Sequence, residues 1–148
     1  MYSFRGHSGE SLRSAGLDLV RAYLGVALFF KGIAFVSRPE LLRSLLEEHG
    51  LMYWGSIAAH YVLAAHFVGG LMLAVGLVTR LAALVQIPVL FTAAFFVHLK
   101  EGLFSMHQNL ELTLLVLFLL IVIAVAGSGR LSLDHVLLQK KQEAPAHA

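Results

Sequence analysis

Long apolar runs alternate with short polar stretches along most of the chain. The runs cover residues 17–36, 56–79, 81–99 and 110–127. Each is close to the roughly 20 residues that a helix needs to cross the hydrocarbon layer of a membrane. A soluble domain of this length could not bury four such helices in its core. The pattern therefore predicts an all-α membrane protein, folded as a four-transmembrane-helix bundle.

A shorter amphipathic segment lies between the first two runs. Ser37 can cap a helix, Pro39 suits its first turn, Glu40 completes a capping box, and Gly50 ends the segment. At about 12 residues this helix is too short to span a bilayer. We expect a short interfacial helix, which would act either as a lid over one end of the bundle or as a simple surface anchor.

Polar segments flank the apolar part of the chain. We expect residues 1–16 to form a flexible cytoplasmic arm, 17–137 the transmembrane domain and 138–148 a flexible cytoplasmic tail. The face that holds both termini carries seven basic residues: Arg5, Arg13, Arg21, Arg80, Arg130, Lys140 and Lys141. The opposite face carries Arg38, Arg43 and Lys100. The positive-inside rule therefore predicts that both termini are cytoplasmic.

Composition agrees with a membrane protein and excludes several other classes. Hydrophobic residues make up 58% of the chain and charged residues 14%. The basic residues sit at the ends of the apolar runs, so the net charge of +2 does not indicate nucleic-acid binding. The chain has no cysteine, which excludes disulfide, iron–sulfur and thiol chemistry from its own side chains.

Several residues interrupt the apolar runs. Gly69 and Gly70 predict that the second helix packs closely against a neighbour inside the bundle. Pro88 should kink the third helix or open its carbonyl ladder. In the first helix we expect Arg21 to snorkel to the interface, whereas Lys31 is equally compatible with snorkelling and with an inward, paired position.

Polar residues gather in the outer half of the predicted bundle, away from the termini. They are Lys31, His60, His66, His98, His107, Asn109 and Glu111. Ionisable groups are costly inside a membrane and usually pair and mark a functional path. In a set of imidazoles beside a carboxylate, an imidazole N–H can donate a hydrogen bond to a quinone oxygen, and the imidazole or the carboxyl group can exchange a proton with it.

This set predicts a quinone or quinol site. We take Glu111, His66 and His98 as the catalytic candidates, and Lys31, His60, His107 and Asn109 as the binding candidates. His60 and His66 lie about 240° apart around a helix and cannot both face one point. His66 is the deeper of the two and is the one predicted in the site.

Other interpretations of these residues remain open. His98 and His107 could be interface residues wetted by solvent, and Glu111 could simply stabilise the start of its helix. His66 and His98 could ligate a haem b from opposite sides, which we favour less than a quinone. A metal site made by His66, His98 and Glu111 would rest on ligand type alone, and we predict none.

A second polar group lies at the cytoplasmic end. It consists of Asp18, Arg21, Arg80, Arg130 and Asp134. Two acids and three bases at the ends of helices indicate an ion-pair network that holds the bundle together.

Several motifs along residues 21–137 are similar to those of a known family. They are Arg21 to Gly25, Phe29 to Gly32, Gly69–Gly70, Gly76 to Arg80, His98, Glu111 and Gly127 to Asp134. In these motifs the chain resembles the DoxX-like family of small four-helix membrane proteins. It departs from the family's usual pattern at His66, where members often carry an acid, and at Lys31, which is commonly histidine or apolar.

The resemblance implies a multi-pass protein of the bacterial or archaeal plasma membrane. It also implies similarity to the membrane subunit of thiosulfate:quinone oxidoreductase, and hence a partner oxidoreductase or a homo-oligomer. A non-catalytic membrane anchor or assembly factor for a partner complex is the alternative. A transporter is least favoured, because four helices leave little room for a gated path.

Overall fold

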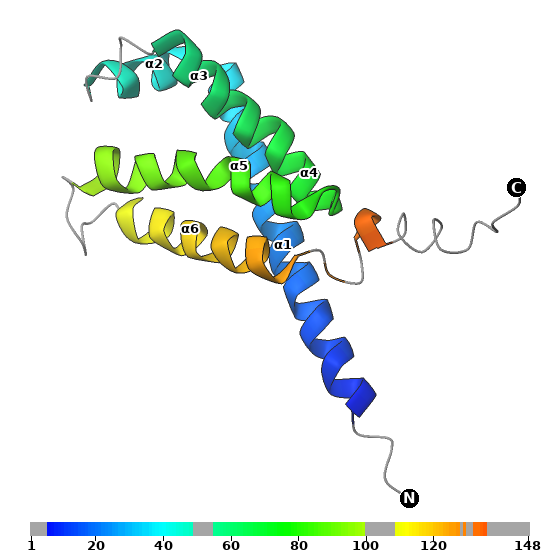
Figure 1. Cartoon of the computed structure of the whole chain (residues 1–148). Helices are drawn as coiled ribbons and strands as arrows, with labels where there is room; N and C mark the ends of the chain where they lie inside the picture. Colours follow the sequence, from blue (N-terminus) through cyan, green and yellow to red (C-terminus); the bar gives the residue numbers. More distant parts are fainter. Residues whose placement is uncertain (1–5, 49–54, 100–108, 128, 130–131, 136–148) are drawn as a thin grey trace, which may run out of the picture.

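The computed structural model describes residues 6–48, 55–99, 109–127, 129 and 132–135, and these ranges are almost entirely helical (Figure 1). The first two helices are α1 (Gly6–Ser37) and α2 (Pro39–Glu48). The second span consists of α3 (Gly55–Ala64), the π-helix η2 (Ala65–Gly69) and α4 (Gly70–Val75). The third span consists of α5 (Thr79–Thr92) and the π-helix η3 (Ala93–His98), and the fourth is α6 (Asn109–Ala126).

Four helical stretches are long and apolar enough to cross a membrane. They are Ser14–Ser37, Ile57–Val75, Thr79–His98 and Asn109–Ala126. Their outer surfaces are apolar: Leu19 is 73% exposed and Phe118 61%. Their inner surfaces are fully buried at residues such as Leu73 and Leu120. The predicted four-helix membrane bundle is confirmed.

Helix α1 is longer than the sequence pattern suggested. It begins at Gly6, so residues 6–16, for which the sequence analysis expected a flexible cytoplasmic arm, are helical. No proline interrupts this segment, and a helix already formed in the adjoining span extends at little cost. Figure 1 shows the first turns of α1 projecting beyond the other helices. Residues 1–5 and the predicted tail at 138–148 lie outside the described ranges.

Glycines bring α1 against the second span. A Cβ at Gly32 would lie 2.7 Å from the backbone nitrogen of Phe67, and one at Gly70 would lie 2.9 Å from Cα of Phe29. The rings of Phe29 and Phe67 then pack with their centroids 4.9 Å apart. Close backbone approach through small residues is how helices associate in lipid, and the predicted interior role of the glycine pair is confirmed.

The third and fourth spans lie side by side in antiparallel fashion (Figure 1). Pro88 is accommodated within α5, which continues to Thr92. The hydroxyl of Tyr61 donates a 2.7 Å hydrogen bond to the carbonyl of Val85, three residues before this proline. A backbone carbonyl in α5 therefore accepts a hydrogen bond from a side chain of α3. The carbonyl that Pro88 leaves without its helical donor is that of Leu84, so the predicted kink or opened carbonyl ladder stays a prediction.

The short helix predicted between the first and second spans is present as α2. Only Arg38 separates it from α1, so the chain turns sharply at this point. An exposed ion pair joins Arg43 to Glu47 at 2.8 Å along its surface. Figure 1 shows α2 beside the start of α3, at the end of the bundle far from the first turns of α1.

Candidate functional site

His66 is the candidate residue that lies deepest in the bundle. It is part of η2 and is 5% exposed. Its Nδ1 lies 2.9 Å from the carbonyl of Val62, and its ring packs edge-on against Phe35 of α1 at 5.4 Å. A carbonyl only accepts, so Nδ1 carries the hydrogen and, in the neutral ring, Nε2 presents a lone pair. The structure thus holds one tautomer of a buried imidazole.

Two further candidates lie near His66. Lys31 is on the exposed side of α1, and its charge is close enough to act on the imidazole of His66. The next residue, Gly32, packs against the His66 backbone. His60 is exposed, so the two histidines of the second span do face different surroundings. Lys31 and His66 therefore lie on the two elements that meet at this contact, with the lysine at the surface and the imidazole in the interior.

The remaining candidates lie where the third span meets the fourth. His98 is the last residue of η3 and is half-buried. Glu111 is in the first turn of α6, half-buried, with its Oε2 atom shielded from solvent. Asn109 is exposed, and its carbonyl accepts a hydrogen bond from the hydroxyl of Thr113 at 2.7 Å. His107 lies outside the described residues.

Two of the three candidate histidines on the second and third spans lie in π-helical segments. His66 is in η2 and His98 is in η3. Short π-helical turns within α-helices occur often at functional sites, because the extra residue changes which side chains face a neighbour. The apolar pattern carries no signal for them, so the sequence analysis did not anticipate this feature.

The candidates near His66 and those where the third span meets the fourth do not combine into a metal site. Among the described residues there is no cluster of three or more His, Asp or Glu side chains that could hold an ion. His66, His98 and Glu111 are all described, so the alternative of a three-ligand site made by them finds no support.

A further polar group in the interior was not singled out as a site residue. Gln86 in α5 is completely buried, and neither Nε2 nor Oε1 forms a hydrogen bond with another described residue. Its amide lies against Gly69 of η2, where an added Cβ would be 3.3 Å from Nε2. The sequence does carry a signal for this residue, since Gln86 is an amide side chain within an otherwise apolar run.

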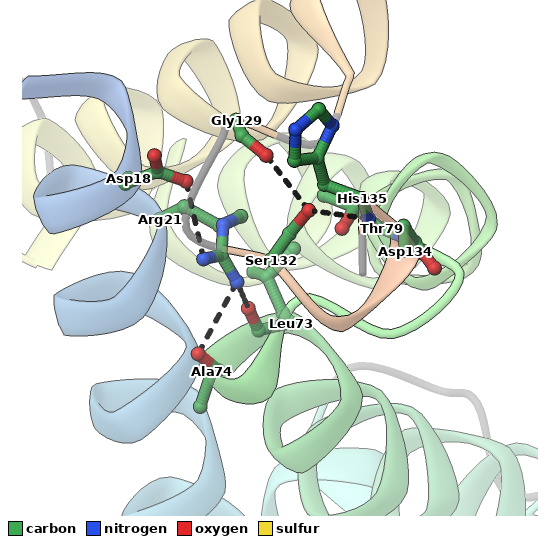
Figure 2. A network of polar contacts seen from close by, with 9 residues as sticks. All are labelled: Asp18, Arg21, Leu73, Ala74, Thr79, Gly129, Ser132, Asp134 and His135. Atoms are coloured by element: carbon green, nitrogen blue, oxygen red, sulfur yellow. Dashed lines mark hydrogen bonds and ion pairs between the residues drawn. The ribbon is translucent and has the colours of Figure 1, made fainter. Parts of the chain in front are cut away.

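At the opposite end of the bundle Arg21 is buried. It is 3% exposed, and its guanidinium donates to the carbonyls of Leu73 at 2.7 Å and Ala74 at 3.2 Å and to Asp18 at 3.3 Å (Figure 2). The expectation that Arg21 snorkels is wrong. The last carbonyls of α4 need donors, and a guanidinium supplies several in a fixed geometry.

Arg21 lies beside the turn between α4 and α5. The C-terminal segment binds this turn through Asp134. Both Gly76 (φ 73°) and Val78 (φ 46°) are left-handed. The carboxylate of Asp134 accepts hydrogen bonds from the backbone N–H groups of Val78 at 2.6 Å and Thr79 at 3.0 Å. Nearby, the hydroxyl of Ser132 donates to the carbonyl of Gly129 at 2.7 Å (Figure 2).

The electrostatics of Asp134 follow from these contacts. Partial burial raises the pKa of its carboxyl group, but the backbone N–H donors of Thr79 and Val78 lower it, and Arg21 adds to this effect. The net result is a pKa below the ordinary value for aspartate. The carboxylate is thus held in its charged form at the start of α5.

This set of residues, called the Arg21 cluster, comprises Asp18, Arg21, Ser132 and Asp134. Asp18 and Arg21 form the ion pair expected at this end, whereas Asp134 accepts hydrogen bonds from backbone N–H groups. Arg80 likewise approaches a carbonyl, that of Val125, at 3.5 Å. Arg130 lies outside the described residues.

Comparison with known proteins agrees with this architecture. The family model named DoxX matches residues 16–99, more than half of the chain. The chain belongs to the DoxX family. No curated protein and no solved structure matches it.

The DoxX match includes the first three spans, with Arg21, His66, Gln86 and His98. It ends before Glu111, whereas the resemblance seen in the sequence motifs extended to residue 137. The family match therefore does not cover the fourth span or the C-terminal part of the Arg21 cluster, and these parts of this DoxX protein are described from its own sequence and structure alone.

Proposed function

We propose that this DoxX-family protein binds a quinone head group within the membrane and supports quinone-linked electron transfer. The observation that carries this proposal is the buried imidazole of His66, with Nδ1 bonded to Val62 and the ring against Phe35. A buried ionisable group in a membrane helix is costly to keep and is a functional candidate by default.

The residues around His66 suit such a ligand. Phe35 lies beside the imidazole, and the Phe29–Phe67 pair lies on the same contact between α1 and the second span. Aromatic side chains pack well against a flat ring. The polar atoms of Gln86 that have no hydrogen bond among the described residues also support a polar ligand in this part of the bundle.

The roles of the side chains follow from their chemistry. A bound quinone supplies carbonyl oxygens that take up protons when it is reduced. Because Nδ1 of His66 donates to Val62, Nε2 can accept a hydrogen bond in the neutral ring and donate one in the protonated ring. Lys31 adds positive charge near the imidazole, and His98 and Glu111 would exchange protons with the outer surface.

The test is equilibrium binding to purified protein in nanodiscs. The probes are short-chain benzoquinone and naphthoquinone analogues, and the variants are His66→Ala and Glu111→Gln. His66→Ala should weaken binding by about tenfold or more, the range for a hydrogen bond to a group that can carry charge. His135→Ala is the control, because this histidine lies beside Ser132 at the opposite end of the bundle and its removal should leave affinity unchanged. Equal affinity in wild type and His66→Ala would remove the proposal.

The alternative function is a membrane anchor or assembly factor. Helix α2 favours it, because its exposed Arg43–Glu47 pair lies at one end of the bundle, where a partner could dock. In that case Glu111→Gln would change stability or recovery of the partner without affecting redox chemistry. A visible absorption spectrum of the purified protein tests haem b, which would absorb strongly.

We further propose that the protein lies in a bacterial or archaeal plasma membrane with both termini in the cytoplasm, beside a partner oxidoreductase or a second copy. The support is the excess of basic residues at the end that holds Arg21. Protease digestion of intact spheroplasts should leave a C-terminal epitope uncut, and cleavage would reverse the orientation.

A further inference from the structure

Gln86 is an unusual residue for the interior of a membrane bundle. It lies within α5, is completely buried, and neither end of its amide has a hydrogen bond with another described residue. In lipid there is no water to satisfy such groups, so each unpaired polar atom costs free energy. A buried amide in this condition calls for a partner, which can be an ordered water or a bound ligand.

The amide faces the same π-helix that carries His66. A Cβ at Gly69 would lie 3.3 Å from Nε2 of Gln86 and 3.6 Å from its Cδ, so the absence of a side chain at Gly69 makes room for the amide. Gly69 follows His66 by three residues, which corresponds to on the order of 5 Å along a helix axis. The amide of Gln86 therefore meets η2 about one helical turn away from His66.

Tyr61 of α3, which precedes η2, connects the lipid-facing surface to the same part of α5. This side chain is 42% exposed, and its hydroxyl is bonded to the carbonyl of Val85, the residue before Gln86. A side chain that faces lipid thus contacts the backbone of α5 one residue before the buried amide.

We propose that Gln86 provides a second hydrogen-bonding position for the quinone head group, one turn deeper in the membrane than His66. This inference rests on the function proposed above. An amide suits both redox forms, because it can donate from Nε2 to a quinone carbonyl and accept at Oε1 from a quinol hydroxyl. It also carries no charge, so it avoids the cost of burying an ion.

The experiment compares Gln86→Met with wild type in nanodiscs. Methionine has nearly the shape of glutamine but lacks the amide. The matched control is Leu90→Met, one turn along α5 and also buried, which tests the effect of repacking this helix. Affinities for a short-chain quinone analogue and for its quinol are measured together with the unfolding temperature without ligand.

Gln86→Met should bind both analogues about threefold to tenfold more weakly, the change expected for one hydrogen bond. It should unfold at the same temperature as wild type or higher, because a buried unpaired amide is removed. Leu90→Met should change neither affinity.

Two results would overturn the inference alone. In the first, wild type and Gln86→Met bind equally well, as expected if the amide holds only water. In the second, Gln86→Met unfolds several degrees lower while Leu90→Met does not, which would give the amide a structural partner. Absence of quinone binding to wild type would overturn both this inference and the proposed function.

Discussion

Replacement of Arg21 by methionine tests the physical account of the end of the bundle that holds the Arg21 cluster. Methionine keeps most of the aliphatic length but removes the guanidinium. The carbonyls of Leu73 and Ala74 then lose their Arg21 donors, and Asp18 loses an ion-pair partner. Because Arg21 is 3% and Asp18 4% exposed, water cannot readily replace the lost bonds.

The expected cost is large. Removal of one partner from a buried ion pair typically destabilises a protein by about 3–5 kcal/mol. This is a substantial share of the roughly 5–15 kcal/mol that stabilises an ordinary domain. The double variant Asp18→Asn/Arg21→Met should be less destabilised than Arg21→Met alone, because it no longer buries an uncompensated carboxylate.

The assay is unfolding by SDS titration in mixed micelles, followed by near-UV circular dichroism. Arg43→Met is the matched control, since it breaks an ion pair of the same type whose arginine side chain is 75% exposed. Such surface pairs contribute about 0–1 kcal/mol. If Arg21→Met and Arg43→Met lost similar amounts of stability, or if the double variant were the least stable, the account of Arg21 would be wrong.

Two further variants test the closed turn and the glycine contact. Asp134→Ala should lower the free energy of unfolding by about 1–3 kcal/mol at pH 7. The folded-state pKa of Asp134 lies below the unfolded value, so its contribution to stability is present above about pH 4 and is lost as the pH falls through the folded-state pKa. The difference in unfolding free energy between wild type and Asp134→Ala should therefore shrink in acid. A difference that grows in acid would contradict this account. Gly25→Ala should destabilise the protein in the same SDS assay, because the new Cβ would lie 2.6 Å from the Cα of Ala74. Gly16→Ala is the control and should be neutral or stabilising, because Gly16 has open space around it. Equal effects of the two substitutions would show that α1 and the second span are not in close contact.

The sequence was sufficient for the architecture. A run of about 20 apolar residues has few alternatives to a membrane helix, because unpaired backbone groups are too costly in lipid. The helix content of the four spans, the short α2 and the packing role of Gly70 followed from this local information. The placement of His66, His98 and Glu111 on the second, third and fourth spans followed in the same way.

Only the tertiary structure decided which polar side chains are buried and what they contact. Arg21 was expected at the interface, yet it is buried because the end of α4, more than fifty residues away, offers it carbonyls. His66 lies in the interior and His60 at the surface, and a π-helix lies between Ala64 and Gly70. Gln86 is buried against Gly69 of another span. Hydropathy depends on neighbours in sequence, whereas the pairing of a buried polar group depends on segments that only the fold brings together.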